Sequence, residues 1–146
     1  MGSRSIIDVH VIFRRAHVIL LLERQGTGYC DGMLQLPSGH LEEGEPIPNG
    51  AAREAQEEVG VNVSPADLSL AAVVHHHQRP DLARVGIFLL AEEWAGEPVV
   101  AEPEKAGKLV WADPRVLPST TIAYPAEGLR AWLDGDRLSL HGWPNC

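Results

Sequence analysis

Four charged residues lie close together near the middle of the chain: Arg53, Glu54, Glu57 and Glu58. If residues 51–59 form a helix, the three glutamates are three and four positions apart and share one helical face. Like charges at these spacings cost a helix roughly 0.2 to 0.5 kcal/mol per pair, and the sequence interleaves no lysine among them. A bound divalent cation would turn this repulsion into coordination.

The types of side chain in this cluster limit the type of metal. The cluster contains carboxylates and neither His nor Cys. Oxygen ligands are typical of hard cations, so the pattern predicts Mg²⁺ or Mn²⁺ rather than zinc. The alternative interpretation is an acidic surface helix whose spacing is accidental.

The stretch that contains the cluster resembles the signature of the Nudix hydrolases, G-x5-E-x7-R-E-U-x-E-E-x-G-U, in which U is aliphatic. The fixed positions are occupied by Gly39, Glu45, Arg53, Glu54, Glu57, Glu58 and Gly60, and Val61 suits the last U. If each common residue type occurs at about one in fifteen, seven such matches arise by chance on the order of once in 10⁸ start positions. The match is therefore specific, although it covers only this stretch.

The resemblance implies a fold and a reaction. The implied fold is of the α/β class, the α/β/α sandwich of the Nudix fold with a mixed β-sheet, in one domain over residues 1–146. The implied reaction is hydrolysis of a diphosphate linkage between a nucleoside and another moiety, with Mg²⁺ or Mn²⁺ as cofactor. Candidate substrates are ADP-ribose, a nucleotide sugar or a (deoxy)nucleoside triphosphate.

The resemblance also implies a set of metal ligands. Glu57 and Glu58 are the principal expected ligands, and the backbone carbonyl of Ser38 or Gly39 completes the shell. Glu54 is expected either as a third ligand or as the base that takes the proton from water.

Two further catalytic roles follow from the resemblance. Arg53 is expected to orient the carboxylates together with Glu45 rather than to touch the substrate. Nudix enzymes commonly take one more carboxylate from a loop before a late strand. Glu104 and Glu102 both match that region, and the sequence leaves the choice between them open.

Substrate phosphates need local hydrogen-bond donors because the chain is acidic, with a net charge of −8. The candidates are Arg84, Arg79, His77 and, in the glycine-rich loop before the signature, Tyr29. The alternative for the polar run around residues 75–81 is a solvated strand end. Its three consecutive histidines do not predict zinc, because neighbours on a strand point to opposite faces.

Composition narrows the class of protein. A chain of 146 residues with 45% hydrophobic content can enclose one core, and its acidity argues against binding of a nucleic-acid backbone. The apolar run Val18–Leu22 is too short to cross a membrane. Cys30 and Cys146 form no disulfide framework, which favours a reducing, cytoplasmic location. The partner is therefore expected to be a small nucleotide, and a homodimer is compatible with this size.

Periodicity predicts where the strands and helices lie. Strands are expected at residues 6–13, 17–23, 68–75, 84–91 and 108–112, and helices at 51–59 and 126–133. Residues 24–36 are expected to form either a long functional loop or a loop with a short strand at 33–36. Pro46, Pro48 and Gly50 leave the start of the first helix open, whereas Gly60 suits its end. The tail after residue 137 shows no motif, and Trp143 is expected on the body or at a dimer contact.

Two other functions use the same kind of domain. One is a regulatory Nudix domain that binds nucleotides without turnover. Loss of a signature glutamate would favour it, and all of them are present. The other is isomerisation of a prenyl diphosphate, which needs a reactive cysteine, for which Cys30 is the candidate near the signature.

Overall fold

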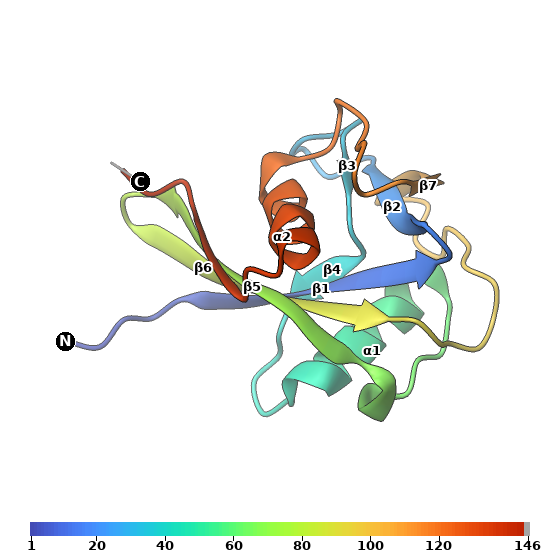
Figure 1. Cartoon of the computed structure of the whole chain (residues 1–146), viewed down its shortest axis with the longest axis horizontal. Helices are drawn as coiled ribbons and strands as arrows, with labels where there is room; N and C mark the ends of the chain where they lie inside the picture. Colours follow the sequence, from blue (N-terminus) through green and yellow to red (C-terminus); the bar gives the residue numbers. More distant parts are fainter. Residues whose placement is uncertain (145–146) are drawn as a thin grey trace.

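A mixed β-sheet lies between two helices in the computed structural model of the chain, which describes residues 1–144 (Figure 1). The strands are β1 (Ile6–Arg15), β2 (Val18–Arg24), β3 (Leu34–Gln35), β4 (Ser38–His40), β5 (Ser69–Arg79), β6 (Leu82–Ala91), β7 (Ala106–Ala112) and β8 (Leu138–His141). The helices are α1 (Ile47–Val59) and α2 (Ala123–Asp134), with a short 3₁₀ turn at Pro65–Asp67. The expectation for Cys146 lies outside the described residues.

β1 is the central strand because its apolar, β-branched sequence is buried along most of its length. The strand order is β3-β2-β1-β6-β5-β8, with β4 paired to β1 and β7 paired to β2. β1 runs parallel to β6 and antiparallel to β4 and β2, and β8 runs parallel to β5. The sheet is therefore mixed, as predicted.

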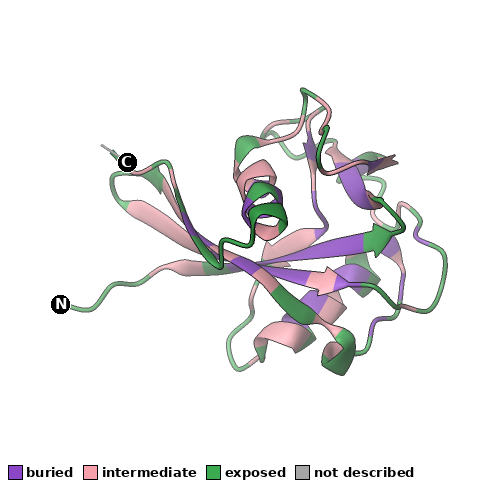
Figure 2. Ribbon diagram, in the orientation of Figure 1, coloured by how far each residue is buried: buried purple, intermediate pink, exposed green. Residues whose placement is uncertain are grey.

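Alternation along β1 sends its side chains to two separate cores. Val9, Val11 and Phe13 pack with the apolar face of α1, whereas Ile12 packs with Phe88 and with α2. Figure 1 shows α1 below the sheet and α2 above it, and Figure 2 shows buried residues along β1 and on the helix sides that face it. The α/β/α sandwich is confirmed.

α1 begins at Ile47, four positions before the residue from which periodicity predicted it. Pro46 caps the helix without a side-chain hydrogen bond, and Gly50 is buried in the first turns. A Cβ on Gly50 would lie 2.6 Å from Leu41 Cδ1 and 2.8 Å from Glu45 Oε1, so glycine lets the helix approach the preceding loop closely. Gly60 ends the helix in the left-handed conformation, as predicted.

The β5–β6 hairpin and the C-terminal tail differ from expectation. The hairpin extends to Arg79 and Leu82, so residues 75–77 lie within a strand instead of at its end. The tail forms β8, which the sequence analysis missed because its four residues are stabilised by pairing with β5 rather than by any local pattern. Trp143 packs on the body, where its Nε1 donates a 2.8 Å hydrogen bond to the carbonyl of His75.

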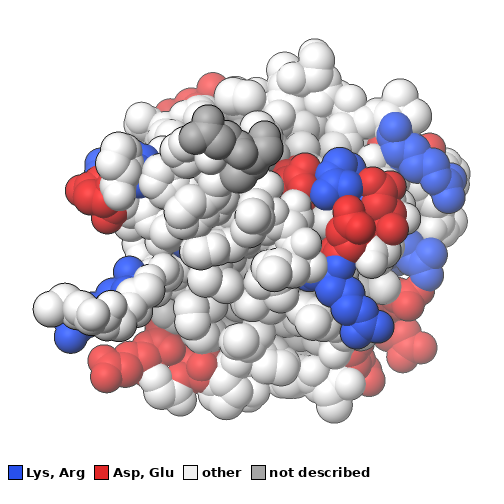
Figure 3. Space-filling model, turned by 60° about the vertical axis from the view of Figure 1, so that its left-hand side comes forward, with Lys and Arg blue, Asp and Glu red and all other residues white. Residues whose placement is uncertain are grey.

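The lengths of the helices and the distribution of surface charge in the described part of the chain bear on the kinds of partner. Neither α1 nor α2, nor any other helix within residues 1–144, is long and apolar enough to cross a membrane. On the face drawn in Figure 3, Lys and Arg side chains lie in small groups beside Asp and Glu side chains. That face therefore presents mixed charge rather than a basic stripe.

Candidate active site

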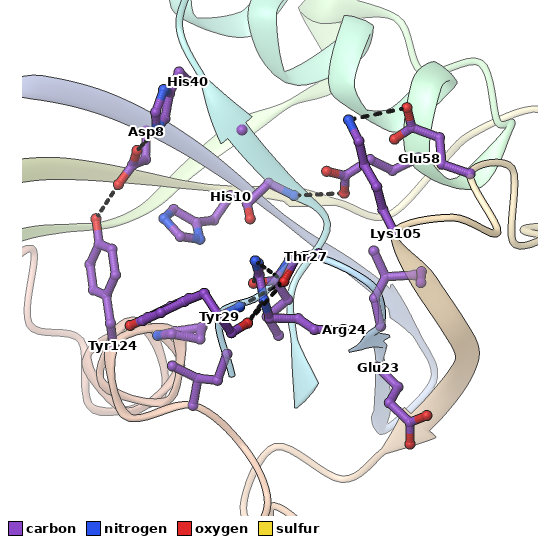
Figure 4. A pocket seen from close by; sticks show the side chains of 18 of the residues that line it. Asp8, His10, Glu23, Arg24, Thr27, Tyr29, His40, Glu58, Lys105 and Tyr124 are labelled. Carbon is purple, nitrogen blue, oxygen red and sulfur yellow. Dashed lines mark hydrogen bonds and ion pairs between the residues drawn. The ribbon is translucent and has the colours of Figure 1, made fainter. Parts of the chain in front are cut away.

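A cleft of about 550 Å³ runs across the sheet and contains groups of two kinds. Figure 4 shows Glu58 and Lys105 on one side of it, and Asp8, His10 and Tyr124 on the other. The first side is formed by the C-terminal end of α1 and the loop before β7, and the second by β1 and the start of α2. We call these the carboxylate end and the aromatic end.

Arg53 organises the glutamates of α1 and the preceding loop. Its Nε donates to Glu45 Oε2 at 2.8 Å, and its Nη1 donates to Glu54 Oε1 at 2.8 Å and to Glu57 Oε2 at 3.2 Å. Its Nη2 donates to the carbonyl of His40 at 3.1 Å. The hydrogen bond from Arg53 lowers the pKa of Glu45. These hydrogen bonds fix the carboxylates of Glu45, Glu54 and Glu57 relative to one another.

Glu58 and Glu54 hold negative charge that the chain only partly compensates. Glu58 lines the cleft, and its Oε2 accepts a 3.0 Å hydrogen bond from the backbone N–H of Ser38. Burial, followed by the charge of Glu54, raises the pKa of Glu58 well above its usual value. Burial also raises the pKa of Glu54, despite Arg53. A cation at this end of the cleft would relieve both effects.

Gly39 brings the backbone of β4 against these carboxylates. A Cβ at this position would collide with the carboxyl group of Glu54, so a side chain there would displace it. Gly39 and Ser38 both line the cleft. The arrangement places two glutamates and a strand backbone around the same end of the cleft.

A model of the NUDIX domain family matches residues 4–133. The chain belongs to the Nudix family. It is 33% identical over 92 residues to the 8-oxo-dGTP diphosphatase of Escherichia coli (strain K12), an alignment that covers 63% of this chain and 69% of that protein. These similarities support an enzyme of the Nudix type that acts on phosphoric anhydride bonds.

Solved Nudix structures share the fold. The MutT Nudix hydrolase of Burkholderia pseudomallei superimposes with a TM-score of 0.79 at 26% identity, covering 88% of this chain and 98% of that one. The MutT protein of Methanosarcina mazei Go1 gives a TM-score of 0.76 at 19% identity, covering 94% and 99%. The second likeness shows the fold alone.

The oxygen donors of this Nudix site suit magnesium or manganese. Within residues 1–144, no group of three or more His, Cys, Asp or Glu side chains is arranged to hold a metal ion. Glu54, Glu58 and the backbone at Gly39 lie at the carboxylate end, whereas Glu57 is exposed on the same helix, and its role as a metal ligand stays a prediction. Mg²⁺ takes few protein carboxylates and keeps several waters, so this small donor set fits it.

Of the two loop glutamates, the structure brings Glu102 to the site. Glu102 lines the cleft, and its Oε2 lies 3.6 Å from Nζ of Lys105, which also lines it. Glu104 is exposed and lies outside the cleft. The turn before β7 therefore directs Glu102, and not Glu104, into the cleft, and the catalytic role of either glutamate stays a prediction.

Two of the four residues predicted to contact the substrate line the cleft, and the other two do not. Arg84 and Tyr29 line the cleft. Arg79 lies outside it and pairs with Asp81 at 3.0 Å, and His77 stacks on Trp143. Alternation along β5 explains the position of His77, because neighbouring side chains on a strand face opposite sides.

His76 occupies the place in the cleft that the sequence analysis gave to His77. Its ring stacks on Tyr124 at a centroid distance of 4.2 Å, and its Nδ1 lies 2.9 Å from Nδ1 of His141. The three consecutive histidines thus contact different neighbours on the two faces of β5.

The sequence analysis missed the floor of the aromatic end. Asp8 is 5% exposed and accepts hydrogen bonds of 3.0 Å from Arg84 Nη1 and from the Tyr124 hydroxyl. Burial raises the pKa of both Asp8 and Tyr124. Asp8 and His10 are alternate polar residues in an apolar strand, and this pattern was the available signal.

Proposed function

We propose that this Nudix hydrolase is a pyrophosphohydrolase dependent on Mg²⁺ or Mn²⁺ that cleaves the diphosphate linkage of a nucleoside diphosphate derivative, with (deoxy)nucleoside triphosphates as the first substrate class. The observation that carries the proposal is the carboxylate of Glu58 at one end of a cleft of about 550 Å³, with the carboxylate of Glu54 against Gly39 at the same end. Ligand pockets of this order accommodate a nucleotide. The relative named 8-oxo-dGTP diphosphatase supports a triphosphate substrate.

The chemical problem is the inertness of a diphosphate, whose negative oxygens repel an attacking hydroxide. A bound Mg²⁺ supplies charge screening, acidification of a bound water and stabilisation of the leaving phosphate. Glu58, Glu54 and the backbone at Gly39 hold the ion in this proposal. Arg53 keeps the carboxylate of Glu54 in place through its 2.8 Å hydrogen bond.

Glu102 is the proposed base. It lies in the cleft beside Lys105 and, unlike Glu54, makes no hydrogen bond to Arg53 in the described structure. It accepts the proton of the attacking water. The ammonium of Lys105 lies at the carboxylate end and binds the phosphate oxygens, which offsets the negative charge that gathers there.

A coupled phosphate-release screen tests this function. Nucleoside triphosphates, ADP-ribose and nucleotide sugars are incubated with enzyme and Mg²⁺, and products are detected separately through inorganic pyrophosphatase and through alkaline phosphatase. Signal from a triphosphate through pyrophosphatase supports the proposal, and Glu58→Gln should abolish it. Signal only through alkaline phosphatase would move the substrate to ADP-ribose or a nucleotide sugar.

Silence in both assays, with nucleotide still bound in equilibrium dialysis, would contradict turnover and favour a regulatory binding domain. Mg²⁺ omission with EDTA is the second arm. Full activity without a divalent cation would contradict the metal-dependent part of the proposal.

A further inference from the structure

The imidazole of His10 is a buried polar group at the aromatic end whose partner is not supplied by the described chain. His10 is 5% exposed, and neither Nδ1 nor Nε2 has a hydrogen-bond partner within residues 1–144. A buried polar group without a partner costs about 1–3 kcal/mol, and native proteins keep few of them. An unpartnered side chain of this kind therefore indicates a ligand or a function.

Aromatic neighbours pack against the ring of His10 but form no hydrogen bond with its nitrogens. The ring stacks on Phe88 at a centroid distance of 4.2 Å and meets Tyr124 edge-on at 5.1 Å. The hydroxyl of Tyr124 is already donated to Asp8. Figure 4 shows the imidazole directed toward Tyr124 from the floor of the pocket, and His10 is one of the residues that line the cleft.

The charge state of His10 limits the kind of ligand group that its ring can bind. Burial, and next the neighbouring charges of Arg84 and His76, lower the pKa of His10 to about 3. The ring is therefore neutral at physiological pH, with one N–H donor and one acceptor nitrogen. A neutral imidazole suits a neutral polar group rather than a phosphate. Lys105, which would bind a phosphate, and the glutamates proposed to hold a cation lie at the other end of the cleft.

The aromatic lining favours a flat ligand over a sugar. Tyr124 and His76 present stacked rings at this end, and Tyr29 lies exposed at the cleft over the guanidinium of Arg24, 5.4 Å from its Cζ. Planar heterocycles stack on such faces and carry donors and acceptors on their edges. A nucleobase meets both requirements.

We propose that His10 is a specificity-determining residue that forms a hydrogen bond with the edge of the substrate's nucleobase at the aromatic end of the cleft. The inference rests on the proposed nucleotide substrate. The inference names the residue that recognises the nucleobase. Nucleotide binding can be measured without hydrolysis, so the test does not depend on turnover.

The test is equilibrium binding by titration calorimetry. The ligands are dGMP, dAMP, dCMP, dTMP and, as a probe that lacks a base, ribose 5-phosphate, each with Mg²⁺. The variant is His10→Phe, which keeps an aromatic ring of similar shape against Phe88. The matched control is His17→Phe, in the exposed turn between β1 and β2. Thermal unfolding of each variant accompanies the titrations.

We expect wild-type protein to prefer some bases over others, and His10→Phe to weaken the preferred nucleotide about tenfold or more, which corresponds to about 1.4 kcal/mol. Binding of ribose 5-phosphate should change less than twofold. His10→Phe should fold as stably as wild type or better, because it removes unpartnered buried nitrogens. His10→Asn, which restores a donor and an acceptor, should recover part of the preference.

Three results would overturn the inference: wild-type binding that ignores the base, unchanged preference in His10→Phe, or equal weakening of ribose 5-phosphate. The outcome is separable from that of the proposed function. Base-selective binding lost in His10→Phe, without hydrolysis of any triphosphate, keeps the inference and rejects the function. Hydrolysis of a triphosphate, together with unchanged base preference in His10→Phe, would keep the proposed function and reject the inference.

Discussion

Gly39 leaves no room for a Cβ beside the carboxyl group of Glu54, because a Cβ built there would collide with Glu54 Oε1. We predict that Gly39→Ala lowers kcat/KM roughly 10- to 100-fold, the usual effect of disturbing the groups that orient a metal ligand. The physical reason is displacement of the Glu54 carboxylate. Steady-state kinetics with saturating Mg²⁺ measure it.

Gly44→Ala is the control for this variant. Gly44 has a positive φ of +78° and no atom within 4 Å of an added Cβ, so alanine costs stability there without touching Glu54. Equal loss of activity in both variants would show that general destabilisation, not the Gly39–Glu54 contact, causes the effect.

Glu58 and Glu57 are neighbours on α1 but differ in their surroundings. Glu58 lines the cleft, whereas Glu57 is exposed and contacts Arg53 at 3.2 Å. We predict that Glu58→Gln lowers kcat by roughly 10² to 10⁴, since charge at a metal site contributes several kcal/mol to the transition state. Glu57→Gln should lose no more than about fivefold, the value of an exposed ion pair. Steady-state kinetics of both variants under the same conditions test this prediction. Equal losses of kcat would indicate that Glu57 is also a metal ligand.

Arg53 holds Glu45 and Glu54 with its planar fork, and its side chain is 23% exposed. Lysine cannot reproduce that geometry, so Arg53→Lys should lower the free energy of unfolding by about 1–3 kcal/mol, or roughly 2–4 °C in Tm per kcal/mol. Arg130→Lys is the control, because Arg130 also pairs with three carboxylates but is 44% exposed. A larger Tm loss in Arg130→Lys would contradict the structural role given to Arg53.

Glu127 links α2 to β8 and makes stability depend on pH. Hydrogen bonds from Arg130 and then Ser139 lower its pKa below the usual 4.5. The ionised form therefore contributes stability that is present above pH 4.5 and is lost as the pH falls through the lowered folded-state pKa. Glu127→Gln should flatten this part of the acid limb by about 1 kcal/mol or less.

Urea unfolding between pH 3 and 6 tests the role of Glu127. Asp134→Asn, an exposed partner of the same arginine, is the control. An acid limb of unchanged slope in Glu127→Gln would assign the loss of stability to other groups.

Trp143 fastens the C-terminal segment to the β5–β6 hairpin. Its Nε1 donates to the carbonyl of His75, and its ring stacks on His77 at a centroid distance of 4.6 Å. Trp143→Ala should lower the free energy of unfolding by about 1–3 kcal/mol. Trp143→Phe keeps an aromatic ring and loses the hydrogen bond, so its Tm should lie between those of wild type and Trp143→Ala. An unchanged Tm in Trp143→Ala would show that this contact adds no stability.

The sequence alone determined that the glutamates of α1 share one helical face, because helical spacing is a local property. The spacing of Glu54, Glu57 and Glu58 puts them on one side of any helix that contains them, and Gly60 ends that helix by its own conformational freedom. The alternation in residues 6–13 likewise predicts the strand that β1 forms. These features depend on neighbours within a few residues, so they could be predicted before any tertiary contact was known.

The tertiary structure decided which distant residues meet in the cleft. Asp8 and Tyr124 are 116 positions apart, and β8 exists through its pairing with β5. The path of a turn places Glu102 rather than Glu104 in the cleft, and the register of a hairpin places His76 rather than His77 there. No local pattern encodes these relationships, because their free energy comes from contacts that form only when the sheet and α2 are assembled.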